Sequence, residues 1–262
     1  MTALTRNNVV VTGAGKRAMV FAHGFGCDQN IWRCVAPAFE RDFRVVLFDH
    51  VGAGKSDLSV YDPVKYAFLE GYATDLVELC RELGVEHGVF VGHSVSGMIG
   101  VLAAKLAPDL FDDMVMICPS PRYINDVDYV GGFTEAEIHE LLDSLDNNYM
   151  GWSQAMAPVI MGNPDRPELG DELTNSFCRT DPEIAKRFAR MTFLSDNRAD
   201  LDGFAMRTLV LQCAEDVIAP QSVGEYVHRR LVNSRLVNLV ATGHCPNLSA
   251  PEETIAAIRS FV

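Results

Sequence analysis

The feature that most constrains the fold is a short apolar run, Val89-Phe90-Val91, that leads into Gly92-His93-Ser94-Val95-Ser96. The run is β-branched and aromatic, which predicts a buried strand, and residues 96–106 after it predict a helix. A serine between small residues at a strand-to-helix junction is the pattern of a nucleophile elbow, a sharp turn that exposes the hydroxyl in front of a sheet. The pentapeptide alone is common, so its meaning depends on the rest of the chain. Ser94 is the candidate nucleophile.

Apolar segments typical of strands alternate with helical segments along most of the chain. Besides the strand before Ser94, strands are expected at residues 8–12, 17–22, 44–48, 114–118, 208–213 and 234–240. Helices are expected from a cap near Asp28 through Phe39, over a segment that ends at Gly84, and at about 222–231 and 251–261. This alternation predicts an α/β fold with a mostly parallel sheet that is covered by helices on both faces.

Residues 120–201 break the alternation, because they contain no convincing strand and about four helical segments. Thr134 and Glu137 form a capping-box pattern, and Asp181-Pro182 is typical of a helix start. We therefore expect a core formed by residues 1–119 and 202–262. Residues 120–201 are expected to form an inserted helical cap that covers the pocket over Ser94.

A serine hydroxyl needs an adjacent base, and that base needs a carboxylate to orient it. In hydrolases with an elbow of this kind, the acid follows the serine in the chain and the histidine comes last. Asp216 follows a late predicted strand, and His244 lies in a loop after the last one. Glu215 is the rival acid, and Asp216 is preferred because it lies one step further from the strand. The predicted triad is Ser94, Asp216 and His244, whereas dehalogenation would need a carboxylate at position 94.

Acyl transfer also needs hydrogen-bond donors that face the developing oxyanion. The backbone N–H of Val95, directly after the candidate nucleophile, is one predicted donor. The loop His23-Gly24-Phe25-Gly26 follows an early predicted strand and suits the second donor, which we assign to the N–H of Phe25. The ring of Phe25 would then form one wall of the pocket.

The segment Ala53-Gly54-Lys55-Ser56 resembles part of a phosphate-binding loop, but two observations argue against that interpretation. Asp49 stands where such a loop requires its first glycine, and its carboxylate would repel phosphate. In addition, the residues after Asp57 do not have the pattern of a helix.

Charge and cysteine content narrow the possible partners and compartments. The 262 residues carry a formal net charge of -13, which argues against nucleic acid and anionic membranes as partners. No apolar run reaches the length of a membrane span, and the first residues lack the pattern of a secretory signal. Seven cysteines without a C-x-x-C pair are typical of a reduced, cytoplasmic protein. No metal or other cofactor is expected.

With these motifs in place, the chain resembles the RsbQ family of bacterial stress-response α/β-hydrolases, relatives of the plant karrikin and strigolactone receptors. The resemblance spans nearly the whole chain and is carried by residues 23–29, 47–52, 92–95, 129–133, 148–152, 194–196 and 243–246. It implies an eight-stranded α/β-hydrolase sheet with a four-helix, V-shaped cap over a small apolar cavity.

The same resemblance implies a ligand and a partner. The ligand would be a small hydrophobic ester, lactone or butenolide-type compound, in a cavity lined by Phe25, Phe133, Trp152, Met156 and Phe193. Proteins of the RsbQ type act with a PAS-domain phosphatase to activate an alternative sigma factor. Two hypotheses follow: a serine hydrolase, or a ligand-binding signalling protein with little turnover.

Overall fold

A computed structural model describes residues 2–262, in which seven strands form one sheet with the order β1-β3-β2-β4-β5-β6-β7. Strand β1 is antiparallel to β3, and all other neighbouring strands are parallel. The strands are β1 (Val10–Thr12), β2 (Ala18–Ala22), β3 (Arg44–Leu47), β4 (Gly88–His93), β5 (Phe111–Ile117), β6 (Arg207–Glu215) and β7 (Ser234–Thr242).

Each of the seven segments that the apolar runs predicted forms a strand. The count of eight strands that the resemblance implied is not met, because residues 2–262 contain seven in this sheet. The chain before β1 forms the short helix α1 (Ala3–Arg6) and a turn at Asn8, whose φ is +46°. Strand β1 is the first strand of the sheet order, so it lies at the edge of the sheet, and Val10 and Val11 are exposed there.

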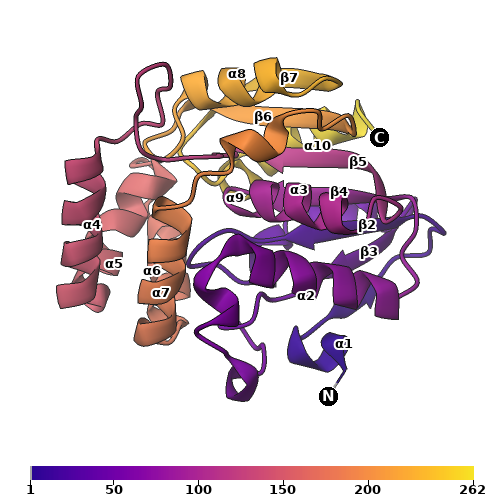
Figure 1. Ribbon diagram of the computed structural model, residues 1–262, viewed down its shortest axis with the longest axis horizontal. Coiled ribbons are helices and arrows are strands. Elements are labelled where there is room, and N and C mark those ends of the chain that lie inside the picture. Colours follow the sequence, from indigo (N-terminus) through magenta and orange to yellow (C-terminus); the bar gives the residue numbers. More distant parts are fainter. Residues whose placement is uncertain (1) are drawn as a thin grey trace.

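Helices cover both faces of the sheet (Figure 1). One face packs against α2 (Leu69–Glu82), α3 (Ser96–Leu106) and α8 (Gln221–Arg230), and the other against α9 (Pro246–Ser249) and α10 (Pro251–Arg259). Alternate residues of β2 point to opposite faces of the sheet: Met19 and Phe21 pack in one apolar core, and Val20 and Ala22 pack in the other. The side chains of β2 are therefore buried on both faces of the sheet, as expected of a parallel sheet that is covered by helices on both sides.

The helix expected from Asp28 to Phe39 is two short 3₁₀ segments, η1 (Gln29–Trp32) and η2 (Ala36–Phe39). The start is as predicted, because the Asp28 carboxylate accepts a hydrogen bond from the Asn30 N–H at 2.8 Å. The break has a local cause: Pro37 lacks an N–H and cannot continue the bonding of a preceding turn.

Four helices lie between β5 and β6 and stand together beyond one end of the sheet, at the left of Figure 1. The capping box of Thr134 and Glu137 and the Asp181 N-cap are formed as the sequence predicted. The helices are α4 (Glu135–Asn147), α5 (Tyr149–Met161), α6 (Pro167–Arg179) and α7 (Pro182–Phe193).

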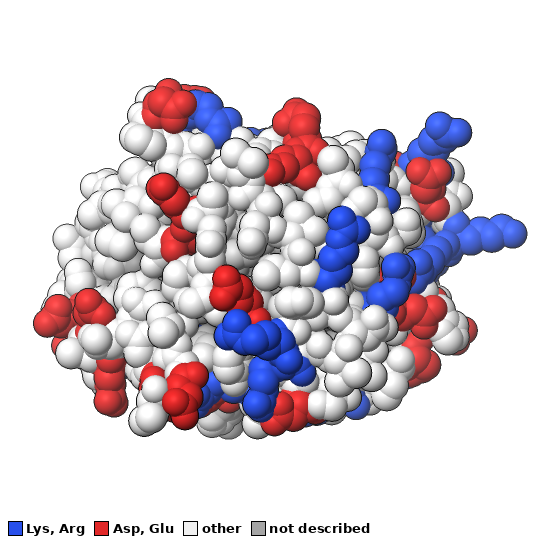
Figure 2. Space-filling view, turned by 90° about the horizontal axis from the view of Figure 1, so that it is seen from above, with Lys and Arg blue, Asp and Glu red and all other residues white. Residues whose placement is uncertain are grey.

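Acidic and basic side chains are interspersed on the surface shown in Figure 2. None of the helices formed by residues 2–262 combines the length and apolar character that crossing a bilayer would require. The seven cysteines all carry free thiols.

Candidate active site

Ser94 follows the last residue of β4 and has a φ of +57°, in the left-handed region that residues other than glycine seldom adopt. Its N–H donates to the carbonyl of Ile117, at the end of the adjacent β5, at 2.8 Å. A side chain at Gly92 would lie 2.7 Å from the backbone of Ser96, which explains the small residue there. This strained turn holds Ser94 at the carboxyl edge of the sheet, where functional sites of such sheets lie.

The structure brings Ser94, His244 and Asp216 into one hydrogen-bonded chain. Nε2 of His244 lies 2.8 Å from Oγ of Ser94, and Nδ1 of His244 lies 2.7 Å from Oδ2 of Asp216. A carboxylate only accepts, so Nδ1 carries the proton and Nε2 is free to accept from the serine hydroxyl. The three residues come from loops after β4, β6 and β7, and the His244 and Asp216 side chains are buried.

The Asp216 carboxylate is held by its own loop as well as by His244. Oδ1 accepts hydrogen bonds from the N–H groups of Ile218 and Ala219, at 2.8 and 3.1 Å. Burial by itself raises the pKa of Asp216, but the charge of His244 and these hydrogen bonds outweigh it, so the pKa lies below its ordinary value. The rival acid, Glu215, is exposed.

The predicted oxyanion donors, the N–H groups of Phe25 and Val95, belong to residues close to Ser94 in the chain or in space. A side chain at Gly24 would lie 3.1 Å from Cβ of Ser94, so the loop before Phe25 packs directly against the candidate nucleophile. Among the hydrogen bonds of residues 2–262, neither the N–H of Phe25 nor that of Val95 has an acceptor. Both donors are therefore available to a ligand oxygen.

A small cavity of about 30 Å³ lies over Ser94 and His244, between the sheet and the inserted helices. Of the five residues predicted to line it, Phe25 and Phe193 do so, but Phe133, Trp152 and Met156 do not. Trp152 instead stacks on Phe177, with ring centroids 5.8 Å apart. The cavity is lined by Phe25, Cys27, His93, Ser94, Tyr123, Ile160, Leu173, Phe177, Thr192, Phe193, Ile218, His244 and Cys245.

Sequence reasoning missed two polar residues of this lining, Tyr123 and Thr192. Both are buried, and the hydroxyl of neither has a hydrogen-bond partner among residues 2–262. The Tyr123 hydroxyl lies near Ser94. A buried hydroxyl without a partner is costly, so each suits a ligand oxygen. No sequence pattern marked them: Tyr123 lies in a loop, and Thr192 lies near the end of α7 without a motif of its own.

One group of side chains near the triad has the donor atoms of a metal site. Single atoms of Cys118, Asp216 and His244 lie within 4.8 Å of one another. However, the Cys213 thiol and burial raise the pKa of Cys118, which disfavours the thiolate that a metal requires. Asp216 and His244 also hydrogen-bond each other. These donors fit a triad better than a metal centre.

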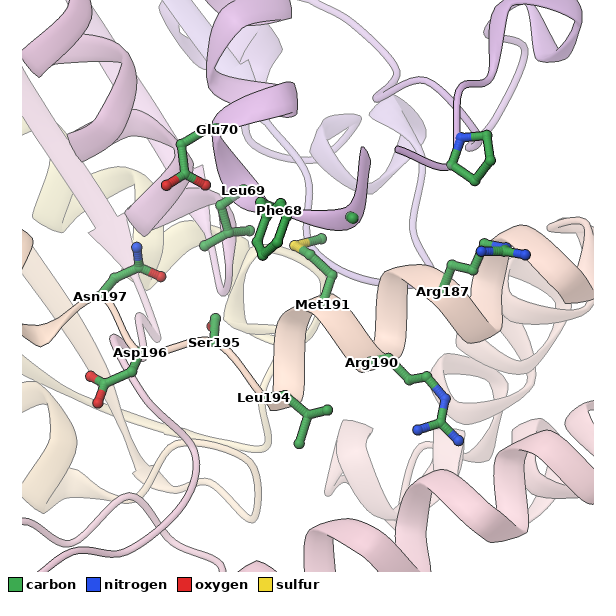
Figure 3. Close-up of a pocket in the computed structure, with 12 residues that line it drawn as sticks. Phe68, Leu69, Glu70, Arg187, Arg190, Met191, Leu194, Ser195, Asp196 and Asn197 are labelled. Atoms are coloured by element: carbon green, nitrogen blue, oxygen red, sulfur yellow. The ribbon is translucent and has the colours of Figure 1, made fainter. Parts of the chain in front are cut away.

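A second pocket lies on the surface between the start of α2 and the end of α7 (Figure 3). Phe68 and Met191 supply apolar lining, and Arg187 and Arg190 add positive charge. It contains Ser195, but no histidine lines it, and the Ser195 hydroxyl donates to the carbonyl of Thr192. This pocket therefore lacks a base that could activate its serine.

Comparison with known proteins agrees with this geometry. The family model described as the alpha/beta hydrolase family matches residues 19–257. The chain is 38% identical over 251 residues to the karrikin insensitive 2 receptor IA of Petunia hybrida, covering 95% of this chain and 92% of that protein. It is 39% identical over 253 residues to the strigolactone esterase D14 of Arabidopsis thaliana, with coverage of 96% and 94%.

A solved structure of a hydrolase from Oleispira antarctica has a TM-score of 0.96 and 41% sequence identity to this chain. The match covers 99% of this chain and 95% of that one. On the family match, the similarity to the plant proteins and this shared structure, the chain belongs to the alpha/beta hydrolase family.

Proposed function

We propose that the protein is a serine hydrolase for a small, apolar ester, lactone or butenolide-type compound. The observation that carries the proposal is the hydrogen-bonded chain Ser94–His244–Asp216, which opens onto an apolar cavity. A nucleophile, a base and an orienting acid in this order are what acyl transfer requires.

The first half of the reaction forms an acyl-enzyme. Oγ of Ser94 attacks the substrate carbonyl carbon while Nε2 of His244 takes the hydroxyl proton, and Asp216 stabilises the imidazolium that results. The carbonyl oxygen becomes an oxyanion that accepts from the N–H groups of Phe25 and Val95. When the intermediate collapses, His244 returns the proton to the leaving alkoxide oxygen.

The second half regenerates the enzyme. A water molecule attacks the acyl carbon, His244 takes its proton, and the ester bond to Ser94 breaks as the carboxylic acid leaves. Ser94 Oγ recovers its proton from His244. With a lactone, the alcohol and the acid are two ends of one product molecule.

Size and lining of the cavity favour a small apolar substrate. Its volume of about 30 Å³ is far below the roughly 300–1,000 Å³ of typical ligand sites, so the proposed substrate is small and the helices over the cavity would have to shift to admit it. Residues 120–201 would act as a cap, with α5, α6 and α7 supplying lining residues, on a core of residues 1–119 and 202–262. The proposed substrate has few polar atoms, for which the Tyr123 and Thr192 hydroxyls are available partners.

The test combines hydrolysis of short-chain p-nitrophenyl esters with fluorophosphonate labelling, followed by mass spectrometry. We expect turnover and one label on Ser94 in the unchanged protein, and neither in Ser94→Ala. Ser195→Ala is the matched control, because it removes a serine hydroxyl from the other pocket and should leave both results unchanged. Hydrolysis that persists in Ser94→Ala would contradict the proposal.

A second candidate function is ligand-dependent signalling with little turnover. Relatives of similar identity are named both a receptor and an esterase, which supports keeping both roles open. On this proposal the chain is a cytoplasmic, RsbQ-type protein in stress signalling, and its ligand-bound form activates a PAS-domain phosphatase. No nucleic acid or membrane partner is proposed, in keeping with the net charge of -13.

Binding to a purified PAS-domain phosphatase, measured with unchanged protein and with Ser94→Ala, separates the two roles. If activation of the phosphatase is lost with Ser94→Ala although binding persists, the signal depends on catalysis. If activation persists with the variant, turnover is incidental to the signal. An absence of binding by either protein would contradict this partner.

A further inference from the structure

Behind the oxyanion loop, the buried residues His23, His50 and Ser96 form a network of hydrogen bonds: the His50 ring bonds the Ser96 hydroxyl, which bonds the His23 carbonyl, and the His23 ring bonds the backbone of His50 and Gly24. We propose that Ser96 and His50 are positioning residues of the oxyanion hole, which hold the His23-Gly24-Phe25 backbone in the geometry that directs the Phe25 N–H at the substrate. The inference rests on the proposed hydrolase function. It assigns a role to two residues outside the triad and the cavity lining.

The first branch of hydrogen bonds runs through Ser96. Its hydroxyl donates to the backbone carbonyl of His23 at 2.5 Å, and the same oxygen lies 2.9 Å from Nε2 of His50. Because a carbonyl can only accept, the Ser96 hydroxyl donates its hydrogen to the His23 carbonyl oxygen. Nε2 of His50 must therefore donate to Oγ of Ser96. Ser96 is therefore fixed from both sides, and its hydroxyl restrains the start of the oxyanion loop.

The second branch runs through the ring of His23. Nε2 of this ring accepts from the backbone N–H of His50 at 3.1 Å, and Nδ1 donates to the carbonyl of Gly24 at 2.9 Å. The Gly24 carbonyl and the Phe25 N–H belong to the same planar trans peptide and point in opposite directions. Holding the carbonyl therefore directs the N–H of Phe25 away from the His23 ring.

Ser96 also links the two oxyanion donors to each other. It directly follows Val95, whose N–H is one donor, and its hydroxyl holds the loop that carries the other. The loop itself packs against the nucleophile, since a side chain at Gly24 would come within 3.1 Å of Cβ of Ser94. One buried hydroxyl thus helps to set the separation of the Val95 and Phe25 N–H groups.

Burial supports this network, because it lowers the pKa of both His23 and His50. Both rings therefore stay neutral near pH 7. A protonated His23 ring would carry a proton on each nitrogen and could not accept from the His50 N–H.

The test compares an ester with the matching thionoester, in which sulfur replaces the carbonyl oxygen. Oxyanion donors stabilise charge on oxygen more than on sulfur, so the ratio of the two kcat/KM values reports on the hole. The variants are Ser96→Ala, His50→Leu, which removes the donor, and His50→Gln, whose amide can still donate. Rates are expressed per site titrated with a fluorophosphonate, so misfolded protein does not count.

We expect Ser96→Ala and His50→Leu to lower kcat for the ester by about 10- to 100-fold, with KM changed less than about threefold. In both variants the ratio of kcat/KM for the ester to that for the thionoester should fall at least about fivefold. His50→Gln should retain most of the ratio of the unchanged protein, because its amide can still donate. Ser153→Ala is the matched control: this serine is equally buried, and its hydroxyl donates to the carbonyl of Tyr149 within α5. It should leave the ratio unchanged.

An unchanged ratio in Ser96→Ala and His50→Leu would overturn this inference, even if both variants lost stability. If Ser96→Ala does not fold, the comparison of His50→Leu with His50→Gln decides. An unchanged protein that hydrolyses neither compound would overturn the proposed hydrolase function itself. Failure of the function and failure of the positioning role therefore give different results.

Discussion

Nε2 of His93 donates a hydrogen bond of 2.7 Å to the backbone carbonyl of His244. His93 directly precedes Ser94, so the segment that carries the proposed nucleophile is hydrogen-bonded to the loop that carries the proposed base, His244. Burial and the charge of His244 lower the pKa of His93 to about 3. The ring therefore remains a neutral donor, and Ser94 and His244 keep their relative positions through a wide pH range.

The buried histidines predict that the protein loses stability in acid. The pKa values of His23, His50 and His93 are all lowered from the ordinary 6.5, with burial as the largest cause. Below pH 6.5 the unfolded chain binds protons at these positions and the folded protein does not, so the free energy of unfolding falls as pH falls. For His93 this continues to about pH 3.

For His93, which stays neutral over this range, the loss should be about 2 kcal/mol of unfolding free energy between pH 7 and pH 5. Urea unfolding at the two pH values measures the loss. His50→Gln should reduce the difference, because it removes a ring whose pKa is lowered by burial, whereas His139→Gln, at an exposed position, should leave most of it. Equal stability at pH 5 and pH 7 would show that these rings become protonated in the folded state.

Replacing the orienting acid should nearly abolish turnover. Asp216→Asn removes the charge that stabilises the His244 imidazolium and can favour the wrong tautomer, so kcat should fall by roughly 10³- to 10⁴-fold. Glu215→Gln is the control, since Glu215 is exposed and Asp216 makes the contact with His244. The kcat of each variant is measured with a short-chain ester. If kcat fell more in Glu215→Gln than in Asp216→Asn, Glu215 would be the orienting acid.

A methyl group at Gly24 should impair catalysis by moving the oxyanion loop. It would lie 2.9 Å from Nδ1 of His93 and 3.1 Å from Cβ of Ser94, so Gly24→Ala should lower kcat by about 100-fold or more. Gly84→Ala offers the opposite test. Gly84 has a φ of +61° with open space around it, so the change should cost about 1 kcal/mol of stability and leave kcat unchanged. Equal kcat values for both variants would contradict the loop's role.

Tyr123→Phe should weaken ligand binding without destabilising the protein. The hydroxyl has no partner among residues 2–262, so its removal costs no internal hydrogen bond, and the melting temperature should not fall. A substrate that accepts from this hydroxyl should show a KM about 5- to 20-fold higher. Thermal unfolding and ester kinetics on the same preparations measure both effects. A lower melting temperature with unchanged KM would indicate a structural role instead.

The sequence was most informative where a residue's role depends on local backbone geometry. Gly92 and Ser94 predicted a strand-to-helix turn, and the positive φ of Ser94 shows why the pattern is restrictive. Asp216 and His244 were predicted from the order of serine, acid and histidine along the chain, each in a loop after a late strand, and loops after parallel strands meet at one edge. At this edge of the sheet, His244 hydrogen-bonds both Asp216 and Ser94.

The sequence was less informative where a role depends on the direction of a side chain within a packed layer. Trp152 is aromatic and lies on an inserted helix, but its ring stacks on Phe177 and does not line the cavity. Tyr123 lies in a loop without a distinguishing pattern, yet it lines the same cavity as Ser94. Helical spacing cannot separate these outcomes, because neighbours from other helices decide which ring reaches the cavity.

Phe25 connects the inserted helices to the chemistry. Its ring lies within 5.5 to 6.2 Å, centroid to centroid, of one aromatic ring on α5, one on α6 and two on α7, namely Trp152, Phe177, Phe188 and Phe193. A bulky ligand that forces these helices apart would also shift Phe25, whose N–H is the proposed oxyanion donor. On the proposed mechanism, a molecule too large for the cavity would therefore be disfavoured both when it binds and when its bond is cleaved.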